Sequence, residues 1–183
     1  MTSPRDATRS IPERRDAGTG RAPDPGSFAP LAPERAARWA NFANWDVTHF
    51  PQVVGLEVEE IRQDYARMRL PYRAELNQPA GVVHGGALAI LIDTVIVPAI
   101  GAAYDSVPLM LTPSMNINFV GAVREQDAIA EGWIVRRGRS IVFCEAAIHG
   151  ADGAPTATAT LVYSIRVPST ERQPVPRDGG STT

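Results

Sequence analysis

Lysine is absent from this sequence, and cysteine is almost absent. All 18 basic residues are arginine, and the 20 acidic residues leave a formal net charge of -2. With no excess of positive charge, nucleic acid is not an expected partner. The single cysteine, Cys144, excludes an internal disulfide, and it lies in an apolar alternating run where a buried, unreactive thiol is expected. These features predict a cytoplasmic protein.

Long apolar runs are missing from both ends of the chain. Residues 1–30 are rich in Arg, Asp, Pro, Gly, Ser and Thr and contain no apolar stretch of the kind found in a secretory signal. We predict that residues 1–30 and the similar tail at 168–183 are disordered. Because 183 residues with 44% apolar content suit one core, residues 31–167 are predicted to form a single domain.

Hydrophobic periodicity predicts a short helix, two strands, a longer helix and then four strands. Gly138 and Gly153 mark tight turns between the last three strands, which are expected to form an antiparallel meander. The predicted helices cover residues 33–45 and 85–103, and the predicted strands cover 53–63, 64–72, 114–119, 128–136, 140–149 and 155–167.

The second helix, at 85–103, is apolar on every side and must be surrounded by protein or by lipid. Asp93 and Pro98 near its middle, and the polar half of each strand, argue against a membrane span. Pro98 is expected to kink or end the helix. The predicted fold class is therefore α+β, with a curved antiparallel sheet wrapped around one long apolar helix.

The start of this helix carries the most informative motif, His84-Gly85-Gly86. Glycines at a helix start leave the first backbone N–H groups unobstructed. Those donors, together with the positive end of the helix dipole, can hold an oxyanion as it forms on a carbonyl. Gly85 and Gly86 suit this role. His84 is interpreted either as an orienting hydrogen-bonding group or as a packed imidazole.

Asp93 is the one ionisable residue in the apolar helix, and a buried carboxylate without a partner is costly. It serves either as a structural partner inside the fold or as a nucleophile or general base. Asp93 follows Gly85 by eight residues, which is roughly 12 Å along one helix. If both groups act on one bond, they must come from two chains across a two-fold axis.

Other hydrolytic arrangements are not supported. The sequence has no GxSxG motif, and Cys144 lies in a predicted strand rather than at a helix start. The three histidines have no spaced carboxylates or thiols that would complete a metal site. No metal or other cofactor is therefore predicted.

The segment from about Leu76 to Ile165 resembles the hotdog-fold acyl-CoA thioesterases of the phenylacetate-degradation (PaaI-like) group. The resemblance rests on HGG with Asp93 nine residues after His84, and on Gly81 three residues before that histidine. The apolar helix, the MNINF strand, the RRGRS turn and the closing strands follow in the expected order. The resemblance implies an acyl-CoA thioesterase that works as a homodimer or homotetramer.

The same resemblance implies roles for individual residues. Asp93 would attack the thioester carbonyl or activate a water, and the backbone N–H of Gly85 would stabilise the oxyanion. Thr112 would help to place the water, although a strand threonine often bonds only to backbone. Related enzymes carry an asparagine six residues before the histidine, where this chain has Gln78, preceded by Asn77. A turn insertion would favour Asn77 and a substitution Gln78, and both are retained as candidates.

Substrate binding is expected at two places. Gly86 lies beside the expected oxyanion site, and three arginines, Arg136, Arg137 and Arg139, surround the predicted turn at Gly138. Guanidinium groups can bind phosphates bidentately, and the resembling enzymes bind the nucleotide part of coenzyme A near this turn. The alternative is that the arginines only solvate an exposed turn.

Two other functions remain open. A hotdog hydratase or dehydratase would use a histidine together with a carboxylate, and no histidine follows Asp93 within a few positions. A non-catalytic acyl-CoA-binding protein would retain the fold without turnover. The identity of the acyl group, and the choice between coenzyme A and an acyl carrier protein, are left open by the sequence.

Overall fold

The structure is a computed structural model that describes residues 22–167. Residues 1–21 of the predicted N-terminal tail, and the whole tail predicted at 168–183, lie outside the described residues. The helices are α1 (Pro33–Trp39), α2 (Phe50–Val54) and α3 (Gly85–Gly101), with 3-10 turns at Pro25–Ser27 and Ala74–Leu76. The strands are β1 (Glu57–Arg62), β2 (Tyr65–Leu70), β3 (Asn77–Gln78), β4 (Val82–Val83), β5 (Leu109–Phe119), β6 (Ala128–Arg137), β7 (Ile141–Gly150) and β8 (Pro155–Arg166).

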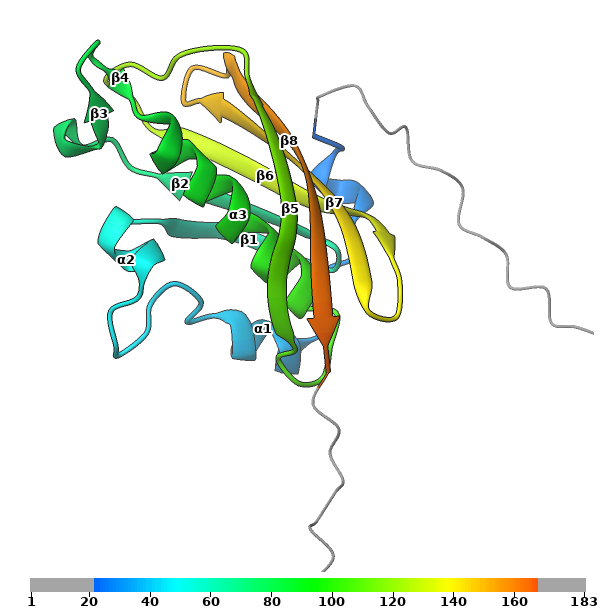
Figure 1. Cartoon of the computed structure of the whole chain (residues 1–183). Coiled ribbons are helices and arrows are strands. Elements are labelled where there is room, and N and C mark those ends of the chain that lie inside the picture. The colour runs from blue at the N-terminus through cyan, green and yellow to red at the C-terminus, as the bar shows by residue number, and fades with distance from the viewer. Residues whose placement is uncertain (1–21, 168–183) are drawn as a thin grey trace, which may run out of the picture.

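One curved sheet holds six of these strands, and α3 lies against its inner face (Figure 1). The strand order is β1-β2-β6-β7-β8-β5, every pairing is antiparallel, and β1 and β5 form the two edges. The predicted meander of the last three strands and the sheet wrapped around one apolar helix are both confirmed.

The core is the interface between α3 and the sheet. Leu91, Ile92, Val95 and Ile96 of α3 are completely buried. Close approach of helix to sheet depends on Gly132 of β6, because a Cβ atom there would lie only 2.8 Å from Ile96 Cδ1 and 2.9 Å from Val95 Cγ1. A side chain at position 132 would push the helix off the sheet.

The helix predicted at 33–45 is wrong in its extent. α1 ends at Trp39, and Ala43 adopts a left-handed φ of 65° that no α-helix can contain. The strand predicted from residue 53 is also wrong at its start, because residues 50–54 form α2. Gly55, with φ 84°, ends this short helix, and β1 begins at Glu57.

Aromatic contacts explain why the chain leaves the helix after Trp39. Consecutive ring pairs from Trp39 to Phe42, Trp45 and His49 have centroids 5.2–5.3 Å apart, and Trp39 is buried. A Cβ atom on Gly101, the last residue of α3, would lie 2.2 Å from the Trp39 ring. The end of α3 therefore accepts this indole only because residue 101 is glycine.

Pro98 does not end α3, because the helix continues to Gly101, two residues short of the predicted end at 103. A proline costs the helix one backbone hydrogen bond, and burial of its neighbours offsets that loss. No helix among residues 22–167 is both long and apolar enough to cross a membrane.

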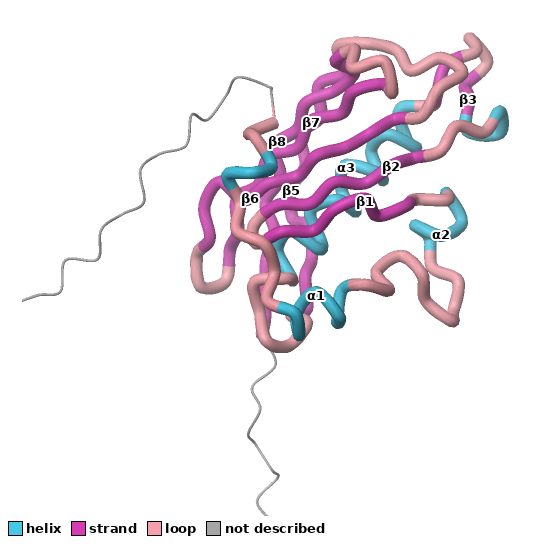
Figure 2. Tube along the Cα trace, turned by 180° about the vertical axis from the view of Figure 1, so that it is seen from behind, coloured by secondary structure: helices cyan, strands magenta, loops and turns pink. Residues whose placement is uncertain are grey.

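The predicted domain start at residue 31 omits a segment that packs on the sheet. Phe28 is only 3% exposed and stacks on Tyr65 with ring centroids 5.0 Å apart. Together with Trp133 and Ala147, these residues form a small cluster on the outer face of the sheet, opposite α3. Figure 2, viewed from that side, shows the sheet in front of α3. The folded part therefore begins before residue 31.

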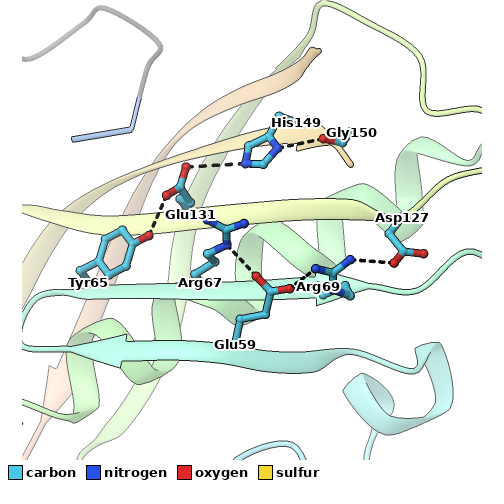
Figure 3. Close-up of polar contacts among 8 residues, drawn as sticks. All are labelled: Glu59, Tyr65, Arg67, Arg69, Asp127, Glu131, His149 and Gly150. Atoms are coloured by element: carbon cyan, nitrogen blue, oxygen red, sulfur yellow. Dashed lines mark hydrogen bonds and ion pairs between the residues drawn. The ribbon is translucent and has the colours of Figure 1, made fainter. Parts of the chain in front are cut away.

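Polar side chains cover another part of the outer face (Figure 3). Glu59 of β1 binds both Arg67 and Arg69 of β2, and Arg69 also donates to Asp127. The pKa of Asp127 is lowered mainly by the hydrogen bond from the backbone N–H of Tyr72, and to a smaller extent by the hydrogen bond from Arg69. On the same face, Tyr65 donates to Glu131 at 2.7 Å. These contacts tie β1, β2 and the start of β6 together away from α3.

Candidate functional site

A small hairpin fixes the start of α3. β3 and β4 are joined by residues 79–81, with Gly81 at φ 72° and a backbone hydrogen bond from its N–H to Gln78 O. This is the three-residue hairpin turn that places glycine in the left-handed region. The backbone N–H of His84 donates to Leu76 O at 2.8 Å. His84 is thus held at the point where the chain enters the helix.

His84 is the N-cap of α3. Its Nδ1 accepts a hydrogen bond from the backbone N–H of Gly86 at 2.8 Å, so a neutral His84 ring carries its proton on Nε2. This contact occupies the Gly86 donor. The backbone N–H of Gly85, in contrast, has no hydrogen-bond partner among residues 22–167. Gly85 therefore presents the available donor at the positive end of the helix.

Phe119, at the end of β5, covers Gly85. A Cβ atom on Gly85 would lie 3.3 Å from Cζ of the Phe119 ring. Phe119 is 51% exposed as a residue, so its apolar side chain lies beside Gly85 at the surface of the described chain. A carbonyl bound at this N–H would lie next to an aromatic face.

Asp93 lies two turns into α3 and is partly exposed, unlike its neighbours Ile92 and Thr94. Its Oδ1 accepts from Thr112 Oγ1 of β5 at 2.8 Å and from the Tyr163 hydroxyl of β8 at 2.5 Å. Its Oδ2 has no hydrogen-bond partner in the described part of the chain. One oxygen of the carboxylate is fixed, and the other is available.

Tyr163 was not among the residues singled out from the sequence. It is 1% exposed and faces α3 from β8, and its hydroxyl also lies 2.7 Å from the backbone carbonyl oxygen of Asp93. Burial, and then the neighbouring Asp93 carboxylate, raise the pKa of Tyr163. The available signal was the alternation of β8, which places Tyr163 on the core side, where a buried tyrosine needs a hydroxyl partner.

Comparison with known proteins assigns the chain to a family. The family model described as "Thioesterase superfamily" matches residues 80–157, which include the helix start and Asp93. A protein of Halobacterium salinarum named "Putative esterase VNG_1336C" is 32% identical over 124 residues, covering 62% of this chain and 81% of that protein. The chain belongs to the thioesterase superfamily.

Solved structures show that this member of the superfamily has the hotdog fold. The PaaI protein from the phenylacetic acid degradation operon of E. coli matches with a TM-score of 0.65 at 15% identity, over 73% of this chain and 94% of that one. Thioesterase HI1161 of Haemophilus influenzae matches with a TM-score of 0.60 at 22% identity, over 63% and 81%. These matches confirm the predicted fold, and the superfamily match above confirms the predicted family.

The two candidate amides, Asn77 and Gln78, lie in β3 and differ in their surroundings. Asn77 Nδ2 donates to the Tyr72 hydroxyl at 3.0 Å, and its Oδ1 is buried with no hydrogen-bond partner among the described residues. Gln78 Oε1 accepts from the backbone N–H of Ala80 within the hairpin turn. The Asn77 side chain is thus bonded to Tyr72, outside the hairpin, whereas the Gln78 side chain is bonded within the hairpin turn.

The arginines around Gly138 divide into two groups. Arg137 forms an ion pair with Asp64, donates to Ile100 O at 3.3 Å, and lies over the Tyr104 ring. Its guanidinium therefore links the β1–β2 turn to the end of α3. Arg136 and Arg139 are exposed, and neither side chain has a hydrogen bond or ion pair within residues 22–167. These two remain available to a ligand.

Proposed function

We propose that the protein hydrolyses acyl-CoA thioesters to a free acid and coenzyme A. The observation that carries this proposal is the state of Asp93, whose Oδ1 is held by two hydroxyl groups while Oδ2 is available on a partly exposed face of an otherwise buried helix. Two hydroxyl groups fix the orientation of the carboxylate, and partial exposure leaves Oδ2 accessible to a reactant. This one retains an oxygen for chemistry.

In the proposed reaction, Asp93 attacks the thioester carbonyl carbon or removes a proton from the water that does so. Negative charge develops on the carbonyl oxygen, where the Gly85 N–H donates to it. The carbon–sulfur bond then breaks: in the base-assisted route the sulfur takes the proton that Asp93 removed from water, and in the nucleophilic route coenzyme A leaves as a thiolate that is protonated by solvent. If Asp93 is the nucleophile, water hydrolyses the resulting anhydride in a second step.

The two groups would come from two copies of the chain. Gly85 and Asp93 are eight residues apart in one helix, which separates them by roughly 12 Å, too far for both to reach one carbonyl. A surface suited to a second copy lies beside them. Gly86, Ile90, Asp93 and Val97 form the incompletely buried stripe of α3.

The edge strand β5 borders this stripe and supports the same proposal. Met115 and Phe119 are apolar and 39% and 51% exposed, at positions paired with the core residues Leu161 and Ala157 of β8. They therefore lie on the helix side of the sheet, at an edge to which residues 22–167 add no further strand. An apolar face at an open edge is the kind of surface that association buries.

The nucleotide of coenzyme A is proposed to bind near the β6–β7 turn. Arg136 and Arg139 provide two guanidinium groups without partners in the described chain, and phosphates are suitable ligands for them. Arg137 is excluded from this role because Asp64 already binds it. An acyl-CoA and not a free ester is therefore the proposed substrate.

The first experiment is thiol release from a panel of aromatic and aliphatic acyl-CoAs, followed with a thiol-reactive dye. We expect turnover of at least one member, and we expect Asp93→Asn to lower kcat about 100-fold or more. Asn at 93 still offers an oxygen to Thr112 and Tyr163, so the fold is retained. Binding without turnover across the whole panel would instead indicate an acyl-CoA-binding protein.

A mixing experiment tests the two-chain site. Gly85→Pro removes the donor while suiting the first position of α3, and His84 already has the extended conformation (φ -63°, ψ 135°) that a residue before proline adopts. Gly85→Ala keeps the N–H although its methyl group crowds Phe119, so it is the matched control and should lose much less activity than Gly85→Pro. Randomly reassociated Asp93→Asn and Gly85→Pro chains should recover about one quarter of wild-type activity, because half of the dimers contain one intact site out of two. No recovery in verified heterodimers would refute the shared site.

A further inference from the structure

We infer that Tyr163 is a positioning residue for Asp93. Its hydroxyl fixes Oδ1 of the Asp93 carboxylate and thereby makes Oδ2 the reacting oxygen. The inference rests on the proposed function, because it assigns a role within the same site. It adds a residue from β8, near the end of the domain, to a site otherwise built from α3 and β5.

The geometry of the Tyr163 hydroxyl supports this role. It lies 2.5 Å from Asp93 Oδ1 and 2.7 Å from the backbone oxygen of the same residue. The hydroxyl can donate one hydrogen bond, and a charged acceptor forms the stronger bond. When Asp93 is ionised, its Oδ1 therefore accepts the hydrogen bond from Tyr163. Contact with both the main chain and the side chain of one residue restricts how the carboxylate can rotate.

Thr112 completes the arrangement from the other side. Its hydroxyl donates to the same Oδ1 at 2.8 Å from β5, whereas Tyr163 donates from β8. Two donors from two strands converge on one oxygen. Oδ2 is consequently directed to the partly exposed side of α3, where a substrate from solution could reach it.

The groups around Asp93 decide how a pH profile of the reaction is interpreted. The hydroxyl groups of Thr112 and Tyr163 are its hydrogen-bonding partners, and within residues 22–167 no arginine or histidine forms an ion pair with it. Cys144 on β7 also lies near Tyr163, and burial raises the pKa of its thiol to about 12. The thiol and the phenol both stay neutral at acidic pH.

The test compares two buried tyrosines that each donate to a carboxylate. Tyr163→Phe removes the donor to Asp93, and Tyr65→Phe removes the donor to Glu131 on the opposite face of the sheet. We expect Tyr163→Phe to lower kcat about 10-fold or more, with KM changed less than about 2-fold. Its acid limb of kcat should move to higher pH, because an ionised carboxylate that loses a donor is protonated more readily. Tyr65→Phe should leave both readouts unchanged.

The outcomes are distinguishable. An unchanged kcat and acid limb in folded Tyr163→Phe, or equal losses in both variants, would overturn the inference while leaving the proposed function intact. Absence of turnover in the wild-type protein would overturn the proposed function itself. If Tyr163→Phe does not fold, a fluorinated tyrosine at 163 keeps the hydroxyl and makes it a stronger donor. The acid limb should then move to lower pH, and an unmoved limb would refute the role.

Discussion

The ring of Phe119 lies against Gly85, so that a Cβ atom on this glycine would be 3.3 Å from the ring carbon Cζ. The contact joins the end of edge strand β5 to the first residue of α3, 34 positions earlier in the chain. Space beside the Gly85 N–H is therefore controlled by a residue outside the HGG motif. The size of residue 119 should influence what can bind there.

A double substitution tests this relationship. Gly85→Ala should reduce kcat/KM about 10-fold, because the added methyl group must displace the Phe119 ring while the N–H is retained. Adding Phe119→Leu should restore part of the loss, since the smaller side chain leaves room for the methyl group. Kinetics of both single variants and the pair give the coupling. Strictly additive effects would show that the ring does not limit access to Gly85.

The two exposed arginines make a prediction about the substrate. Arg136→Leu with Arg139→Leu should raise KM for an acyl-CoA about 10-fold, because two phosphate contacts are lost. The KM for the same acyl group on a short thiol without the nucleotide should not change. Steady-state kinetics on the two substrates separate these effects. An equal change on both would mean that the arginines act on the fold and not on the nucleotide.

Asp64 is predicted to contribute to stability through both its backbone and its side chain. It has a left-handed φ of 66° and forms the ion pair with Arg137. Asp64→Ala should lower the free energy of unfolding by about 1–2 kcal/mol, since alanine is strained at this φ and the partly exposed pair adds only a modest amount. Asp64→Asn, which tolerates this φ and can still accept a hydrogen bond, should lose less. Urea unfolding measures both, and equal losses would contradict the backbone contribution.

Acid stability should depend on Asp127. Its pKa is lowered by the backbone N–H of Tyr72 and then by Arg69, so its carboxylate stabilises the folded state above the pKa of the unfolded chain. That contribution is lost as pH falls through the lowered folded-state pKa. Asp127→Asn should cost about 1 kcal/mol at neutral pH, and its difference from wild type should vanish well below pH ~4. Unfolding measured across pH checks this, and a difference that is constant with pH would exclude the carboxylate as its source.

The sheet and its helix were predictable because their signals are local and periodic. The alternation at Met115, Ile117 and Phe119 and the apolar run from Gly85 each identify one element, and antiparallel packing around one helix follows from their order. The residues around Trp39 were not predictable in the same way. Their helical periodicity is real, but contacts from Trp39 to Gly101 and Phe42 determine where the helix ends.

The site was predictable only in part, and the limit has a physical cause. His84, Gly85 and Asp93 stand out because glycines at a helix start and a charge in an apolar run are unusual within a few residues. Tyr163 is an ordinary strand residue until β8 brings it across from α3, 70 residues away in sequence. Likewise, only the fold shows that Arg137 is already bound by Asp64.

The segment that carries Phe28 has a consequence for the optical properties of the protein. Trp133 is buried in the cluster that Phe28 caps, and it lies on the face of the sheet opposite the proposed site. Its fluorescence should therefore report whether residues 22–30 remain seated on the sheet, independently of substrate. A red shift of the emission on deletion of those residues would show that the Trp133 indole reports on the packing of this segment against the sheet.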